Sequence, residues 1–160
     1  PSPMGGGASL LHCFFTNMWR RGNWRLPGST VHVDCVFMNV LIVEDNKPVS
    51  LVLSRVTEEA GHSWFIAADG EVALRMYQQR DIDMMIVDVE LPGIDGFQVA
   101  REVRNQSAKL PIIIISGNQG DVWQQQALDA GANEFLSKPV RPSALHQLLE
   151  RYLGSTAGIG

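Results

Sequence analysis

A chain of 160 residues with 45% hydrophobic and 19% charged residues has the composition of one soluble globular domain, large enough to bury a core. Its net charge of −4 argues against nucleic acid as a direct partner, because binding to phosphates needs a basic face. No apolar run approaches the roughly eighteen residues that span a bilayer, so no membrane partner is expected.

Residues 1–37 differ from the rest of the chain in charge and pattern. Three arginines against Asp34 give them a net charge of +2 and leave −6 for residues 38–160. They hold both cysteines, Cys13 and Cys35, so the remainder has none, which fits a reducing cytoplasm. They lack a periodic apolar face, so we expect a disordered or non-native extension. The alternative is a basic aromatic patch that touches RNA or an anionic membrane.

From residue 38 onward, short apolar runs alternate with amphipathic segments. The apolar runs predict strands at 40–43, 62–67, 84–87, 111–115 and 133–137. The amphipathic segments predict helices at about 46–60, from 69 onward, and at about 96–105, 121–130 and 143–152. The first helix is expected to bury Val49, Val52, Leu53 and Val56. Trp123 lies at helical spacing from Ala127, which favours core packing over a partner contact. This alternation predicts an α/β fold with a parallel doubly wound sheet.

Polar side chains follow four of the predicted strands. The strand ends deliver Glu44 with Asp45, then Asp88, Ser116 and Lys138. Each residue alone has an ordinary interpretation as a helix cap, a turn former or a surface charge. Carboxyl ends of parallel strands share one edge of a sheet, so we expect these side chains to converge there. Crowded carboxylates favour a hard divalent ion, and Mg²⁺ is the expected cofactor.

Residues 39–153 resemble the receiver domain of two-component response regulators. The resemblance rests on motifs that occur in order and at similar spacing, namely residues 41–46 (Leu-Ile-Val-Glu-Asp-Asn), 87–96 (Val-Asp-Val-Glu-Leu-Pro-Gly-Ile-Asp-Gly), 115–117 (Ile-Ser-Gly), 130–132 (Ala-Gly-Ala) and 138–139 (Lys-Pro). It implies a flavodoxin-like fold with five strands in the order 2-1-3-4-5 and five helices. It also implies a receiver domain over residues 38–153, followed by a flexible tail or the start of a linker at 154–160.

The resemblance further implies a phosphoacceptor site. Asp88 is expected to accept a phosphoryl group from a histidine kinase or a histidine phosphotransfer protein, with Mg²⁺ bound. The implied metal ligands are Asp45, Asp88 and the backbone carbonyl of Glu90, whereas Glu44 acts through water. The domain is then a cytoplasmic regulatory switch. The resemblance implies no enzymatic activity beyond the domain's own phosphotransfer and autodephosphorylation.

The remaining implied roles concern the switch. Lys138 is expected to pair with the phosphoryl group and Ser116 to hydrogen-bond it, while Phe135 turns inward when Ser116 moves. Glu90 and Asn118 match positions that tune phosphoryl lifetime. The change is expected to reach the face formed by the fourth helix, fifth strand and fifth helix, where a homodimer is the expected partner.

Three other functions compete with this interpretation. A flavodoxin-like electron carrier would share the fold, but Glu44 and Asp45 would repel its cofactor phosphate. An aspartyl-phosphate hydrolase would place an Asp-x-Asp pair after the first strand, where this chain has Glu-Asp-Asn. A degenerate receiver that docks without phosphate would not need all of the polar residues described above.

Overall fold

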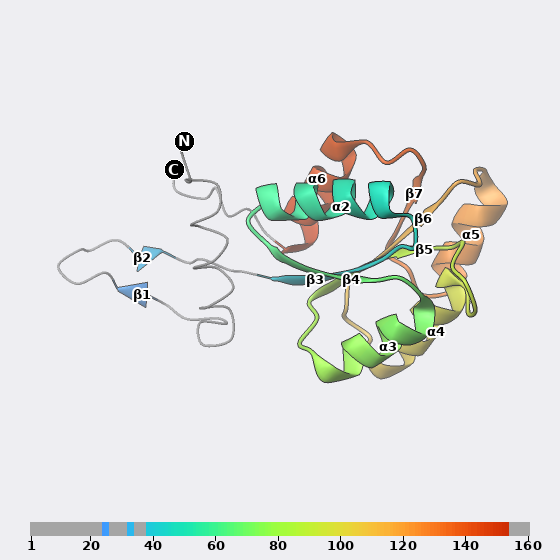
Figure 1. The fold of residues 1–160 in the computed structure, drawn as a ribbon, viewed down its shortest axis with the longest axis horizontal. Helices are drawn as coiled ribbons and strands as arrows, with labels where there is room; N and C mark the ends of the chain where they lie inside the picture. Colours follow the sequence, from blue (N-terminus) through green and yellow to red (C-terminus); the bar gives the residue numbers. More distant parts are fainter. Residues whose placement is uncertain (1–23, 26–31, 34–37, 154–160) are drawn as a thin grey trace.

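The structure, a computed structural model, describes residues 24–25, 32–33 and 38–153. Within residues 38–153, five parallel strands form one sheet in the order β4-β3-β5-β6-β7 (Figure 1). The strands are β3 (Asn39–Val43), β4 (Ser63–Ala67), β5 (Met84–Asp88), β6 (Ile112–Ser116) and β7 (Glu134–Ser137). Numbered along the chain within this sheet, the order is 2-1-3-4-5, which confirms the predicted flavodoxin-like fold.

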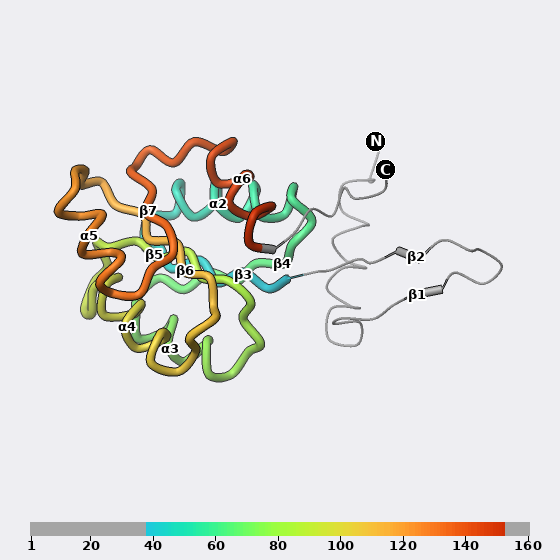
Figure 2. Tube along the Cα trace, turned by 180° about the vertical axis from the view of Figure 1, so that it is seen from behind, coloured from blue at the N-terminus to red at the C-terminus, as the bar shows by residue number. Residues whose placement is uncertain are grey.

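Five helices among the described residues cover the two faces of this sheet. They are α2 (Lys47–Glu59), α3 (Gly70–Gln79), α4 (Gly96–Gln106), α5 (Asp121–Asp129) and α6 (Pro142–Leu153). Helices α2 and α6 pack on one face, and α3, α4 and α5 pack on the other (Figures 1 and 2). Because all five strands are parallel, their carboxyl ends lie at the same edge of the sheet.

Three helices begin at polar side chains that cap their first turn. Asn46 Oδ1 accepts a hydrogen bond from the backbone N–H of Val49 at 3.1 Å, at the start of α2. Asp69 and Asp95 cap α3 and α4 in the same way, at 2.8 and 2.9 Å. These caps satisfy amides that the first turn of a helix leaves unbonded. They therefore fix where each helix leaves the carboxyl edge of the sheet.

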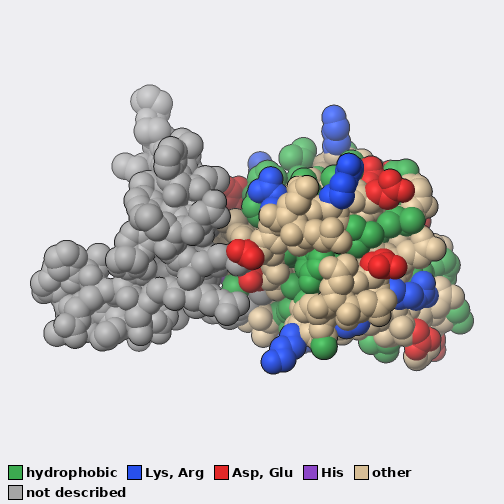
Figure 3. Space-filling view, turned by 90° about the horizontal axis from the view of Figure 1, so that it is seen from below, with side chains coloured by type: hydrophobic (Ala, Val, Ile, Leu, Met, Phe, Trp, Pro, Cys, Tyr) green, Lys and Arg blue, Asp and Glu red, His purple; other side chains and the backbone are tan. Residues whose placement is uncertain are grey.

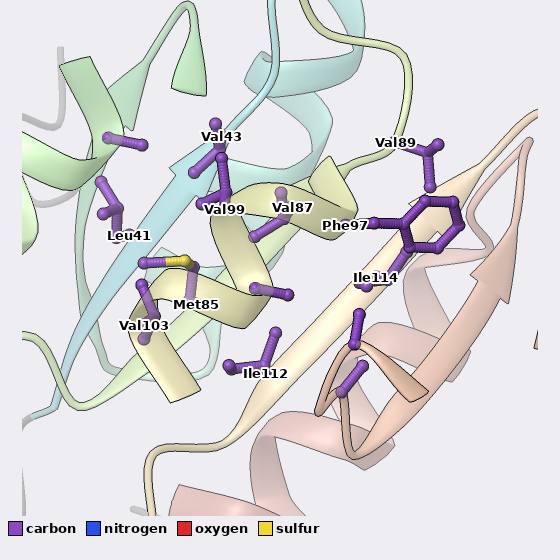
Figure 4. Close-up of a cluster of buried hydrophobic side chains, with 14 of the residues drawn as sticks. Leu41, Val43, Met85, Val87, Val89, Phe97, Val99, Val103, Ile112 and Ile114 are labelled. Atoms are coloured by element: carbon purple, nitrogen blue, oxygen red, sulfur yellow. The ribbon is translucent and has the colours of Figure 1, made fainter. Parts of the chain in front are cut away.

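The core lies on both faces of the two central strands. Every residue of β5 and β6 is buried. Figure 4 shows side chains of β3, β5 and β6 meeting those of α4, among them Met85, Val99 and Ile112. Fully burying one such large apolar side chain stabilises a fold by about 1.5–3 kcal/mol. The ends of β5 and β6 are therefore held in place by the most densely buried part of the described chain.

The predicted inward face of α2 is wrong at one position. Val52 is 45% exposed, whereas the small polar residues Ser50, Ser54 and Thr57 are buried. Their hydroxyl groups donate to backbone carbonyls three or four residues earlier, for example from Thr57 Oγ1 to Leu53 O at 2.8 Å. Hydroxyl groups that form such hydrogen bonds can face the core. A prediction based on residue polarity alone therefore assigns the wrong residues to the buried face of α2.

The predicted second strand begins one residue too early. His62 is buried but precedes β4, and its backbone N–H donates to Thr57 O at the end of α2. The remaining predicted strands agree with the structure to within one residue at each end. Uncertainty of this size is usual, because helix and strand ends fray.

Predictions about the two ends of the chain lie almost entirely outside the described residues. Within residues 1–37 the structure describes β1 (Trp24–Arg25) and β2 (His32–Val33), which pair antiparallel apart from the main sheet. The expected extension at 1–37 and the expected tail at 154–160 remain predictions.

The face of the domain that carries α3 and α4 has mixed charge. Figure 3 shows Lys and Arg side chains interspersed with Asp and Glu side chains on it, separated by uncharged groups. Among the described helices, none combines the length and the apolar character needed to cross a membrane.

Candidate functional site

The carboxyl edge of the sheet brings the predicted polar residues together. Asp88 ends β5 and Ser116 ends the neighbouring β6, while Glu44 follows β3 on the other side of β5. Lys138 follows β7, and its backbone N–H donates to Ser116 O at 2.7 Å. The parallel register aligns Val43 with Val87 and Asp88 with Ile115, so these strand ends lie side by side.

Three carboxylates meet at this edge. Glu44, Asp45 and Asp88 each offer an oxygen, and these three atoms all lie within 4.8 Å of one another. Glu44 and Asp88 are buried, at 2% and 1% exposed, whereas Asp45 is exposed to solvent. Three negative charges at this separation repel one another strongly unless a cation lies among them.

Lys138 supplies one positive charge to this cluster. Its Nζ atom lies 2.8 Å from Asp88 Oδ2, as a hydrogen-bonded ion pair, and 3.0 Å from Glu44 Oε2. The contact with Glu44 is an ion pair without hydrogen-bond geometry, and within the described part of the chain the buried Glu44 Oε2 atom has no hydrogen-bond partner. The other oxygen, Glu44 Oε1, accepts from the backbone N–H of Asn46 at 3.0 Å. One ammonium group therefore faces two buried carboxylates.

The pKa of Asp88 is raised in this buried and mostly acidic site. Burial raises the pKa of Asp88 from 3.8 to about 7; Glu90 and Glu44 raise it too, while the ion pair with Lys138 lowers it. For Lys138, burial lowers the pKa, but the hydrogen bond to Asp88 and the negative charges of Asp88 and Glu44 outweigh burial, so that the pKa is raised. Lys138 is thus a cation at neutral pH, and its charge does not fully compensate the site.

The donor set of the cluster fits a hard divalent cation. Mg²⁺ prefers carboxylate, backbone carbonyl and water oxygens, and it often binds through one or two carboxylates. Asp45 is exposed and forms no hydrogen bond to another side chain among the described residues, whereas Glu44 contacts Lys138 and the backbone N–H of Asn46. Asp45 is therefore the carboxylate best placed to bind an ion from solvent.

A second group of side chains lies beside Asp88. Glu90 Oε1 accepts from Ser116 Oγ at 2.9 Å and from Asn118 Nδ2 at 2.7 Å. Ser116 Oγ in turn accepts from the backbone N–H of Asn118 at 3.0 Å. Burial opposes ionisation of Glu90, but its hydrogen-bonding interactions with Asp88, Ser116 and the backbone of Gly117 together lower its pKa.

The contact made by the Glu90 side chain is absent from the sequence-based predictions, which assign a contact only to its backbone carbonyl. A sequence signal does exist, because Glu90 stands two residues after Asp88 and Asn118 two residues after Ser116. Both loops leave the same sheet edge from adjacent strands, so polar side chains at matching offsets can meet. The spacing of these residues in the sequence does not predict the direction in which each side chain points.

Gly96 shapes the loop that carries Asp88. A Cβ atom at this position would collide with the backbone carbonyl oxygen of Asp88 and would lie 2.9 Å from Val89 Cα. The backbone N–H of Gly96 donates to Val89 O at 3.0 Å. The start of α4 therefore lies directly against the end of β5, which holds the Asp88 backbone in place.

The predicted switch residue Phe135 lies on β7 and packs against the apolar core, not within the carboxylate cluster. Trp123 of α5 packs on the same side, with its ring 6.2 Å from that of Phe97 and an interplanar angle of 23°. This stacked pair confirms the prediction that Trp123 is a packing residue. It links α5 to the first turn of α4, next to the site.

Comparison with known proteins agrees with this geometry. The family model for the response regulator receiver domain matches residues 40–150. The transcriptional regulatory protein AfsQ1 of Streptomyces coelicolor is 34% identical over 107 residues, which are 67% of this chain and 47% of AfsQ1. The chain thus spans about half the length of the curated relatives it matches, or less.

Two solved structures are similar in both fold and sequence. The chemotaxis protein CheY4 of Vibrio cholerae has a TM-score of 0.69 and 32% identity, covering 74% of this chain and 100% of that one. The receiver domain of the sensor histidine kinase PA1611 of Pseudomonas aeruginosa has a TM-score of 0.68 and 31% identity, covering 75% and 100%. That structure carries a magnesium ion in its active-site cleft. The present chain, with its acidic pocket at the same kind of sheet edge, belongs to the response regulator receiver domains of two-component signalling.

Proposed function

We propose that this receiver domain is a phosphorylation-dependent switch in which Asp88 accepts a phosphoryl group from a histidine kinase or a histidine phosphotransfer protein. The observation that supports this proposal most is the placement of Asp88. Its carboxylate is buried at the end of the central strand β5, 2.8 Å from Lys138 Nζ and within a cluster of acidic side chains. A carboxylate held there at a cost in stability has a chemical role that a surface carboxylate does not need.

The transfer requires little covalent chemistry from the protein. An oxygen of Asp88 forms a P–O bond while the P–N bond to the donor histidine breaks. Lys138 is close enough to neutralise charge on the phosphoryl oxygens, and the Ser116 hydroxyl can donate a hydrogen bond to them. The same groups would assist the later attack of water, so autodephosphorylation belongs to the proposal.

Mg²⁺ is the proposed cofactor. Asp45 and Asp88 would bind it directly together with the backbone carbonyl of Glu90, and Glu44 would act through water. When bound, Mg²⁺ neutralises the oxygens of a transferring phosphoryl group. The crowding of three carboxylate oxygens within 4.8 Å around a single lysine supports this assignment.

Receiver domains partner with histidine kinases. In this chain, we assign the output of the switch to the face formed by α5, β7 and α6. A phosphoryl group on Asp88 would draw Ser116 toward it, and the ring of Phe135 on β7 would follow inward. Val122 and Leu128 leave exposed apolar surface on α5, at 68% and 54% exposed. This surface supports a partner or a second copy of the chain as the recipient of the signal.

Incubation of the full chain with Mg²⁺ and acetyl phosphate tests the proposal. Intact-mass spectrometry should detect one added phosphoryl group, which acid or alkali then removes. Asp88→Asn should abolish the addition, because an amide oxygen is a poor nucleophile. Asp129→Asn is the matched control, because Asp129 is exposed on α5, where its Oδ1 atom accepts a hydrogen bond from Gln125 Nε2. Undiminished labelling of the Asp88→Asn protein would contradict the assignment.

A further inference from the structure

The side chain of Glu90 connects the loop after β5 with the loop after β6. Its Oε1 atom accepts from the Ser116 hydroxyl at 2.9 Å and from Asn118 Nδ2 at 2.7 Å. The backbone N–H of Asn118 closes the ring by donating to Ser116 Oγ at 3.0 Å. We refer to these three residues, Glu90, Ser116 and Asn118, as the Glu90 latch.

The latch uses the whole donor capacity of Ser116. A serine hydroxyl has one proton, and here that proton is directed at a carboxylate oxygen. Ser116 is fully buried, at 0% exposed, so its hydroxyl has no access to bulk water. Hydrogen bonds to an ionised acceptor are about twice as strong as neutral ones. Ser116 can therefore donate to a group on Asp88 only by giving up a strong bond to Glu90.

We propose that the Glu90 latch is a brake on activation, in which the Glu90 carboxylate competes with a phosphoryl group on Asp88 for the single proton of Ser116. The proposal rests on the proposed phosphorylation of Asp88 and adds to it a regulatory contact at the same site. Asn118 reinforces the brake, because its side chain holds the Glu90 carboxylate and its backbone holds Ser116 Oγ. Glu90 is thus a positioning residue that acts through Ser116.

The brake predicts a specific effect on a phosphoryl mimic. Beryllofluoride bound to Asp88 with Mg²⁺ presents acceptor atoms to Ser116, so binding includes the cost of opening the latch. Removing the acceptor atom at residue 90 removes this cost and should tighten binding. Removing only the negative charge should also tighten binding, through weaker repulsion, so a test must separate the two effects.

Two substitutions at residue 90 separate them. Glu90→Gln removes the charge but keeps an acceptor oxygen, whereas Glu90→Met has a similar length and neither charge nor acceptor. We expect Glu90→Met to bind beryllofluoride roughly tenfold more tightly than Glu90→Gln, which is the scale of one buried hydrogen bond. Calorimetric titration of the full chain at fixed Mg²⁺ measures both affinities.

The Ser116→Ala background provides the control. Without the hydroxyl there is no proton to compete for, so the roughly tenfold advantage of Glu90→Met over Glu90→Gln should disappear. The double-mutant cycle isolates the part of the effect that passes through Ser116, and any hydrogen bond from the glutamine amide cancels in the comparison.

A second readout needs neither Mg²⁺ nor phosphate. In the unliganded protein, the backbone N–H of Asn118 is protected by its bond to Ser116 Oγ. Glu90→Met should speed hydrogen exchange of this amide several-fold, because Ser116 loses its anchor, and Glu90→Gln should leave it near the wild-type rate.

The outcomes distinguish the brake from the function on which it rests. Equal affinities of Glu90→Met and Glu90→Gln, or an affinity ratio that persists in the Ser116→Ala background, would overturn the brake while the phosphoacceptor site stands. Failure of the wild-type chain and all variants to bind beryllofluoride would contradict the phosphoacceptor site and the brake with it.

Discussion

Asp83 and Asp88 stand at the two ends of β5, and their carboxylates have opposite effects on the stability of the fold. At the amino end, Asp83 Oδ2 accepts from the backbone N–H of Asn39 at 2.8 Å, and the backbone N–H of Asp83 donates to Asn39 O at the same distance. This carboxylate ties β5 to its neighbour β3. At the carboxyl end, Asp88 is buried among other acids with Lys138 as its cation. The first arrangement stabilises the fold, whereas the second one opposes folding and supports a function.

The matched substitutions Asp88→Asn and Asp83→Asn should therefore change stability in opposite directions. Without divalent ions at pH 8, Asp88→Asn should raise the free energy of unfolding by about 1–3 kcal/mol, less than the full pKa shift implies because the ion pair with Lys138 is also lost. Asp83→Asn should lower it by about 0.5–1 kcal/mol, because a neutral amide oxygen is a weaker acceptor. Urea denaturation in the presence of a chelator measures both. Destabilisation by Asp88→Asn would contradict the claim that the buried Asp88 carboxylate opposes folding.

The stability gain from Asp88→Asn should also depend on pH. The pKa of Asp88 is raised from 3.8 to about 7 in the folded protein. Between these values the folded state keeps a proton that the unfolded state has released, so wild-type stability falls as the pH rises. The advantage of the variant should grow from about pH 4 to about pH 7 and then level off. A constant difference across this range, in urea titrations with chelator, would show that charge on Asp88 is not what destabilises the fold.

Mg²⁺ titration should distinguish the two acids that follow β3. Asp45→Ala should weaken Mg²⁺ binding at least about tenfold, because Asp45 is assigned as a direct ligand. Glu44→Ala should weaken binding less, because Lys138 and the Asn46 amide already occupy its oxygens. Calorimetry on the unphosphorylated protein gives both affinities, with Asp83→Asn as the control at the far end of β5. A larger loss of Mg²⁺ affinity in Glu44→Ala than in Asp45→Ala would show that Glu44 is the direct ligand and that Asp45 acts through water.

The smallest expected effect concerns the amino edge of the sheet. A shortened chain that begins at Met38 should melt cooperatively within a few degrees of the full chain and accept phosphate equally well. It retains Met38 O, which accepts from the backbone N–H of Ser63, and the pairing of Asn39 with Asp83. Calorimetry and acetyl phosphate labelling compare the two chains. Loss of cooperative melting would mean that residues 1–37 contribute to the domain.

Most of the fold follows from local sequence, because its signals are strong and redundant. The runs Met84–Val87 and Ile112–Ile115 are apolar throughout, as strands buried on both faces must be. The prediction that Val52 is buried is wrong because serine and threonine residues take the inward positions of α2. Their hydroxyl groups donate to backbone carbonyls of the same helix, which makes them compatible with the core. A pattern of hydrophobic residues does not reveal these hydrogen bonds, so it does not predict that the hydroxyl groups are buried.

The membership of the site was predictable, whereas its internal contacts were not. Asp88, Ser116 and Lys138 end or follow neighbouring strands, and topology alone brings strand ends together. The bond from Ser116 to Glu90 depends on side-chain directions in two loops, which no spacing in the sequence specifies. The preference of Lys138 for Asp88 and Glu44 over water likewise depends on how deeply each carboxylate is buried.

Locating the phosphoryl group on the chain tests directly whether Asp88 is the phosphoacceptor. After labelling with acetyl phosphate and Mg²⁺, borohydride reduces an aspartyl phosphate to homoserine, and tandem mass spectrometry of the peptides identifies the residue. Homoserine is expected at position 88, dependent on Mg²⁺ and absent from the unlabelled protein. Homoserine at Asp45 or at any other aspartate, with residue 88 unmodified, would contradict the assignment of Asp88.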